Sequence, residues 1–173
     1  GTVKARQPVT LAATDTHPGN FLIRRDGRAI FVDLEKMLYG SPAIDLAHAT
    51  LYTSTTWEPG ISVALTPEQT AGFYRAYLEQ VPAELREAIR PWLLPMRRIT
   101  WLRTVTWMVR WRAVSAVRPE DPALGAWSRA RLAPGMVRHV LDRVAHFTEP
   151  ETIARVRSEW LEHCFLERLI QAG

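Results

Sequence analysis

The sequence lacks the features that mark a secreted or membrane-spanning protein. It contains a single cysteine, Cys164, so no disulfide can form within the chain, and such sparse thiols suit a reducing cytoplasm. No apolar run approaches the roughly 20 residues that a membrane-spanning helix needs. We therefore expect a cytoplasmic protein with no membrane partner.

A dense basic block is also missing. The net charge is +4 and the isoelectric point lies near 9.7, but the excess consists of arginines distributed along the whole chain. Nucleic-acid binding is marked by basic residues that cluster on one face or in one run. We expect no nucleic-acid partner, while the basic surface remains suited to small anionic molecules.

The length and apolar content indicate one domain. With 173 residues, of which 47% are hydrophobic, the chain can bury one core, and residues 1–173 are expected to form a single domain. Apolar periodicity and capping signals predict a short strand, loop segments and a series of helices. The strand is expected at residues 9–12, a loop at 35–41 and a linker at 53–65. The helices are expected at residues 42–53, 66–80, 82–90, 91 or 95 to 117, 134–147 and 150–170. The fold class is therefore α+β and mostly helical.

A β-hairpin is predicted between residues 21 and 33. Asp26-Gly27 stands between two apolar runs, and Asp-Gly in this setting is the strongest short-range hairpin signal. A two-residue turn centred on this pair gives cross-strand partners whose numbers sum to 53. Asn20 would then face Asp33, with Cβ atoms roughly 5 Å apart.

A third oxygen-bearing side chain can join this pair. Asp15 precedes Asn20 by five residues, and Pro18-Gly19 makes a tight loop that can fold it back over the same point. Phosphoryl transfer needs a carboxylate that accepts the proton of the attacking hydroxyl, together with oxygen ligands for Mg²⁺. The open end of the hairpin is thus a candidate phosphoryl-transfer site.

The same residues resemble a known family. Residues 15–20 (DTHPGN), the hairpin that ends at Asp33, and residues 40–47 (GSPAIDLA) resemble the aminoglycoside phosphotransferase and choline kinase-like family, relatives of the protein kinases. The resemblance covers residues 13–47 and implies the C-terminal lobe of a protein-kinase-like fold. By resemblance, Asp15 is the catalytic base, Asn20 and Asp33 hold Mg²⁺, and ATP is the co-substrate. Asp45 and His17 would support the loop.

The chain departs from the family pattern at the loop and upstream of it. Ala13 stands where the family usually has His, and Thr14 replaces the usual Gly. The only lysines are Lys4 and Lys36, and no glycine-rich loop precedes Asp15, although a kinase-type site needs both a strand-borne Lys and such a loop. We expect that the N-terminal nucleotide-binding lobe is absent from these residues and is supplied by a longer chain or a partner.

The remaining residues divide into two functional parts. Residues 1–54 would carry the catalytic loop, the hairpin and the bracing helix, in which His48 is expected to be a packed histidine. Residues 55–173 would form a helical subdomain. Its long helix carries four aromatic and basic residues that either pack in the centre of this subdomain or bind the acceptor: Trp101, Arg103, Trp107 and Arg110.

The leading functional hypothesis is an ATP- and Mg²⁺-dependent phosphotransferase that transfers the γ-phosphate to a hydroxyl of a small-molecule acceptor. An inactive relative is the first alternative, suggested by Ala13 and the missing lobe. A helical binding module is the second, in which Asp15, Asn20 and Asp33 only bond the loop internally. The acceptor itself cannot be read from the sequence.

Overall fold

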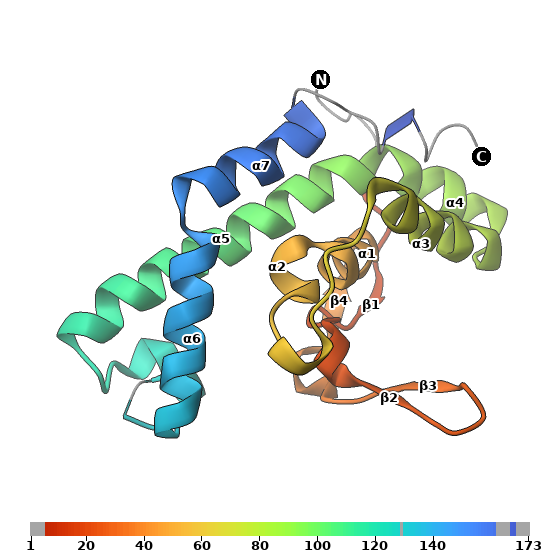
Figure 1. Ribbon diagram of the computed structural model, residues 1–173. Coiled ribbons are helices and arrows are strands. Elements are labelled where there is room, and N and C mark those ends of the chain that lie inside the picture. The colour runs from red at the N-terminus through yellow and green to blue at the C-terminus, as the bar shows by residue number, and fades with distance from the viewer. Residues whose placement is uncertain (1–5, 129, 162–166, 169–173) are drawn as a thin grey trace. The chain divides into compact units, whose positions relative to one another are not determined.

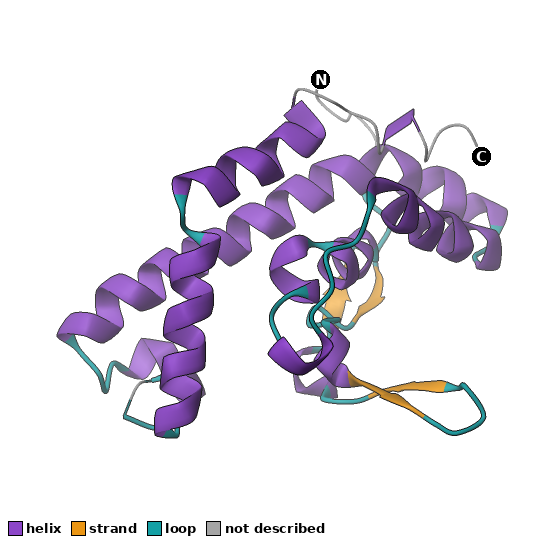
Figure 2. Cartoon of the chain, in the orientation of Figure 1, coloured by secondary structure: helices purple, strands orange, loops and turns teal. Residues whose placement is uncertain are grey.

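The computed structural model describes residues 6–128, 130–161 and 167–168. Helices dominate, and the strands form two small antiparallel sheets, as the α+β prediction requires (Figure 2). Two compact units are present, one of residues 1–101 and 159–173 and one of residues 102–158. Cys164 lies outside the described residues. None of the described helices is long and apolar enough to cross a membrane.

The first sheet joins two segments that are far apart in sequence (Figure 1). Strand β1 (Thr10–Ala12) confirms the predicted strand and pairs with β4 (Leu38–Gly40), with Leu11 opposite Tyr39. The prediction that residues 35–41 are a loop is therefore wrong for its second half. Its first half contains the short 3-10 helix η2 (Leu34–Lys36), which directly follows Asp33.

The predicted hairpin is present, but its register differs from the prediction by one residue. Strands β2 (Phe21–Ile23) and β3 (Ala29–Phe31) pair Leu22 with Ile30, so the partner numbers sum to 52 rather than 53. The cause is the loop length. Arg24 and Arg28 close the hairpin with a backbone hydrogen bond of 2.9 Å, which leaves a three-residue loop with Gly27 at φ 80°. Three-residue loops commonly place a glycine in this left-handed region.

Four helices of the first unit precede the long helix. They are α1 (Ala43–Thr50), α2 (Tyr52–Thr55), α3 (Pro67–Gln80) and α4 (Ala83–Ile89). Helix α3 begins with the predicted capping box, in which Thr66 Oγ1 accepts from the Gln69 amide and the Gln69 side chain accepts from the Thr66 amide. The core consists of buried residues of α1, α3, α4 and the start of α5, namely Ala43, Leu46, Ala71, Tyr74, Leu78, Ile89, Leu93 and Met96.

The long helix α5 spans Leu93–Val117 and confirms the predicted element. Pro95 is tolerated because it lies in the first turn, where backbone amides have no partner within a helix. In the second unit, Trp111 is fully buried, and its Nε1 donates to the Trp127 carbonyl oxygen at 2.7 Å. The unit is completed by the 3-10 segment η5 (Pro122–Trp127), by α6 (Pro134–Phe147) and by most of α7 (Pro150–Leu161).

Candidate active site

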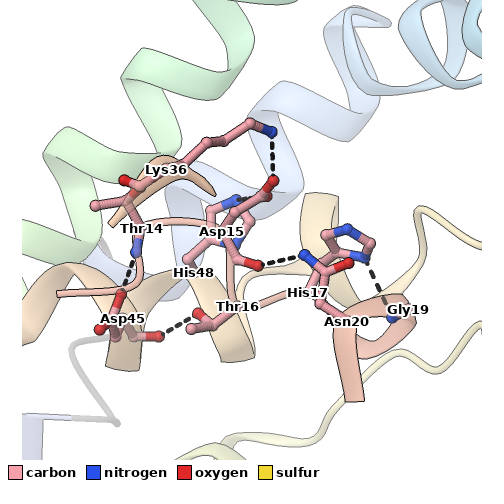
Figure 3. Close-up of polar contacts among 9 residues, drawn as sticks. All are labelled: Thr14, Asp15, Thr16, His17, Gly19, Asn20, Lys36, Asp45 and His48. Atoms are coloured by element: carbon pink, nitrogen blue, oxygen red, sulfur yellow. Dashed lines mark hydrogen bonds and ion pairs between the residues drawn. The ribbon is translucent and has the colours of Figure 1, made fainter. Parts of the chain in front are cut away.

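The loop that carries Asp15 is held by the first turn of α1. Asp45 accepts hydrogen bonds from two consecutive backbone amides, from Ala13 at 2.8 Å and from Thr14 at 2.7 Å. The Thr16 hydroxyl donates to the Asp45 carbonyl oxygen at 2.9 Å. Figure 3 shows the contacts of Thr14 and Thr16 with Asp45. One carboxylate thus fixes the backbone immediately before Asp15.

Thr14 adopts a conformation that side chains of its kind rarely adopt. Its φ is 64°, in the left-handed region that glycine reaches without cost and that a β-branched residue reaches only with strain. The resulting turn directs the Thr14 hydroxyl to the carbonyl oxygen of Lys36, to which it donates at 2.9 Å. Thr14 therefore connects the loop that carries Asp15 to the segment that follows Asp33.

Asn20 joins the same loop to the hairpin. Its Nδ2 donates to the Asp15 carbonyl oxygen at 2.8 Å, and its own carbonyl oxygen accepts from the Val32 amide at 2.9 Å. Val32, rather than Asp33, is thus the residue opposite Asn20, which corrects the pairing expected from the sequence. The Asn20 side chain is buried.

Asp33 follows this pair at the point where regular strand geometry ends. Its backbone is left-handed, with φ 59° and ψ 60°, so the alternation of side chains along β3 does not extend to it. It is exposed, and within the described residues its carboxylate makes no hydrogen bond or ion pair.

The Asn20 and Asp33 side chains each carry an oxygen that could serve as a magnesium ligand. Within the part of the chain that the structure describes, Asn20 Oδ1 accepts no hydrogen bond, so an amide oxygen and a carboxylate are both available. Mg²⁺ commonly takes only one or two protein ligands of this kind and completes its shell with water and phosphate oxygens. No group of three or more His, Cys, Asp or Glu side chains in the described residues could hold a metal ion.

The Asp15 carboxylate has two basic neighbours that sequence reasoning missed. Lys36 Nζ lies 2.5 Å from Oδ2, and His48 Nε2 lies 3.9 Å from Oδ1 (Figure 3). Both come from segments after the hairpin, and no local pattern places them beside Asp15. His48 was expected only to pack. Its position on the inward face of the predicted helix was the one sequence signal that could have placed it near Asp15.

His17 stabilises the loop locally. Its Nδ1 accepts from the Gly19 amide at 3.2 Å, and a Cβ at Gly19 would lie 2.8 Å from the imidazole Cε1. A side chain at position 19 would therefore require the imidazole ring to shift.

The four residues of the long helix that were proposed for acceptor binding have different surroundings. Trp101 is buried and belongs to the first unit, whereas the other three belong to the second. Trp107 packs edge to face on Trp127 with ring centroids 5.6 Å apart, while Arg103 and Arg110 are exposed. The packing interpretation accounts for both tryptophans, and the acceptor-binding role of the four stays a prediction.

Comparison with known proteins identifies the family of the chain. The family model described as the phosphotransferase enzyme family, APH, matches residues 3–92, which is more than half of the chain. No curated protein matches the chain significantly, and neither does any solved structure. The matched region contains every residue described around Asp15.

Proposed function

Because the chain belongs to the phosphotransferase enzyme family, we propose that it is the catalytic C-terminal lobe of an ATP- and Mg²⁺-dependent kinase of small molecules, with an alcohol hydroxyl as phosphoryl acceptor. The observation that carries this proposal is the position of Asp15. Its side chain is 18% exposed. Its carbonyl oxygen accepts a hydrogen bond from Asn20, and the two backbone amides that precede it donate to Asp45.

Asp15 has the properties of a proton acceptor. In the proposed reaction the acceptor oxygen forms a bond to the γ-phosphorus, while the bond between that phosphorus and the oxygen bridging to the β-phosphate breaks. The electron pair of the broken bond stays on the nucleoside diphosphate, and the hydroxyl proton passes to the Asp15 carboxylate. A fixed loop suits this role because positioning supplies much of the rate enhancement in phosphoryl transfer.

Asn20 and Asp33 would hold the magnesium ion, which neutralises charge on the phosphates when it is bound. Asn20 suits this role because its Nδ2 is used in the hydrogen bond to the Asp15 carbonyl oxygen, which leaves its Oδ1 for the metal ion. Asp33 is well placed because it lies one residue after Val32, which pairs with Asn20.

The second half of the nucleotide site is proposed to come from elsewhere. Residues 1–14 contain neither a glycine-rich loop nor a Lys with a Glu partner, and both are needed to hold the phosphates in line. We propose that an N-terminal lobe, in a longer chain or in a partner, supplies them. Residues 1–173 alone should then bind Mg-ATP weakly and transfer phosphate negligibly, which calorimetry and an acceptor assay would test. Tight binding together with turnover would contradict this part of the proposal.

The test of the function is a screen of phosphate acceptors on the full-length protein, followed by two variants. Asp15→Asn should lower turnover by about 10² to 10⁴ while the unfolding midpoint stays unchanged. Asp33→Ala should reduce the rate and raise the Mg²⁺ concentration needed for half-maximal activity. Near-normal turnover by Asp15→Asn would remove the proton-acceptor role. Equal Mg²⁺ dependence of Asp33→Ala and the parent would remove the metal assignment.

A further inference from the structure

We propose that Lys36 is a phosphate-binding residue of this site, whose ammonium group is shared between Asp15 and the transferred phosphoryl group. The inference rests on the proposed function and deepens it. Its starting point is the contact between Lys36 Nζ and Asp15 Oδ2, which measures 2.5 Å and is both an ion pair and a hydrogen bond.

The backbone of Lys36 is fixed at this place. Its carbonyl oxygen accepts from the Thr14 hydroxyl, and the Thr14 amide donates to Asp45. Lys36 also ends the single 3-10 turn that begins directly after Asp33. The backbone of Lys36 is therefore held in the segment that joins Asp33 to helix α1.

The side chain itself can move. The Lys36 side chain is 44% exposed, while the Asp15 side chain that it contacts is 18% exposed. A lysine has a flexible stem and three donors on one nitrogen, so it can keep a carboxylate contact and add a phosphate contact by rotating about its last bonds. Apart from Lys4 and the five histidines, the other basic residues of the chain are arginines, whose planar group is less easily shared between two acceptors than a single ammonium nitrogen.

The charges of the site call for such a cation. Asp15 and Asp33 are two carboxylates, and the transferred phosphoryl group would bring further negative charge beside them. Movement of the Lys36 ammonium group from Asp15 toward the phosphate would place a positive charge beside the transferred group and stabilise its negative charge.

The experiment uses the full-length protein with Mg-ATP as the probe and compares Lys36→Met, Lys36→Arg and Arg25→Met. Arg25 is an exposed residue of the hairpin loop, so its variant controls for the loss of one positive charge. Lys36→Met should weaken Mg-ATP binding in calorimetry by about tenfold, the order expected for one charge-assisted hydrogen bond. Lys36→Arg should restore part of the affinity, and Arg25→Met should bind as the parent does.

A repeat in the Asp15→Asn background separates the two possible roles of Lys36. If Lys36 binds phosphate, Lys36→Met weakens Mg-ATP binding in this background too. If Lys36 only positions Asp15, the effect disappears there, and the proposal is overturned. Unchanged Mg-ATP affinity of Lys36→Met in the parent also overturns it. Failure of the proposed function looks different, because the screen of phosphate acceptors would then find no phosphorylated product, whatever Lys36→Met does to Mg-ATP affinity.

Discussion

Arg97 of α5 closes the C-terminal end of α1 by donating from Nη1 to Thr50 Oγ1 at 2.7 Å and from Nη2 to the Thr50 carbonyl oxygen at 3.2 Å. Its side chain is only 4% exposed. A positive charge at a helix C-terminus interacts favourably with the helix dipole and satisfies carbonyls that have no partner within the helix. Arg97 thus fixes one end of the helix whose other end carries Asp45.

Replacement of this arginine should destabilise the protein. Arg97→Ala removes both hydrogen bonds and leaves a cavity, so we expect the free energy of unfolding to fall by about 2 to 4 kcal/mol. Chemical denaturation measures this quantity. Arg98→Ala is the matched control, because Arg98 is an exposed neighbour on the same helix, and its effect should stay within about 0.5 kcal/mol. Equal effects of the two variants would contradict the capping role.

The left-handed backbone at Thr14 predicts an unusual order of stabilities. Thr14→Ala loses the hydrogen bond to Lys36 and keeps a side chain at positive φ, whereas Thr14→Gly loses the same bond but relieves the strain. We expect the glycine variant to be more stable than the alanine variant by about 1 kcal/mol. At an ordinary loop position alanine is the more stable of the two. Thermal unfolding of both variants would decide, and an alanine variant more stable than the glycine variant would contradict the strain.

The raised pKa of Tyr77 should make the stability of the protein depend on pH in the alkaline range. Burial raises the pKa of the Tyr77 hydroxyl above its usual value of 10.0, and the negative charge of Asp45 raises it further. The neutral phenol is therefore favoured in the folded protein. Its contribution is fully present at neutral pH and is lost as the pH rises from about 10 through the folded pKa.

Tyr77→Phe isolates this contribution. Above pH 10 the unfolding free energy of the parent should fall more steeply than that of Tyr77→Phe, because the variant has no phenol to ionise at this position. Asp45→Asn should in turn lower the pKa of Tyr77 toward its usual value, as ultraviolet titration of tyrosinate would reveal. Parallel alkaline stability curves for the parent and Tyr77→Phe would show that this tyrosine contributes nothing.

The second unit offers a comparison of two adjacent residues. Trp111 is fully buried, so Trp111→Ala should lower the unfolding free energy by about 3 to 5 kcal/mol. Arg110 is exposed, and Arg110→Ala should leave stability unchanged. If Arg110 binds the acceptor, its variant should raise the KM for the acceptor before that for ATP. An equal change of both KM values would remove the predicted acceptor role.

The helices could be predicted because their signals are local. The capping box at Thr66 and the apolar spacing from Pro134 to Phe147 both lie within one element, and the structure has helices α3 and α6 at the predicted places. The hairpin register could not be predicted, because Asp26-Gly27 is compatible with loops of two or three residues. Strand β4 was missed because its three residues depend on pairing with β1, which lies far away in the sequence.

Some residues of the candidate site could also be predicted from the sequence, and others could not. The motif residues Asp15, Asn20 and Asp33 could be selected from spacing, and their roles in the reaction stay predictions. Lys36 and His48 could not be selected, because they reach Asp15 only through the turn after Asp33 and through helix α1. Tertiary folding alone brings their basic groups to the carboxylate.

The double contact of Asp45 with the Ala13 and Thr14 amides has a kinetic consequence. These two amide protons lie in a loop, where exchange with solvent deuterium is normally fast, yet each is held by a charged acceptor anchored in a helix. They can exchange only when the loop separates from α1 or when α1 itself opens. The segment before Asp15 should therefore open as one cooperative unit with the first turn of α1, at rates far below those of the exposed hairpin loop at Arg25 and Asp26.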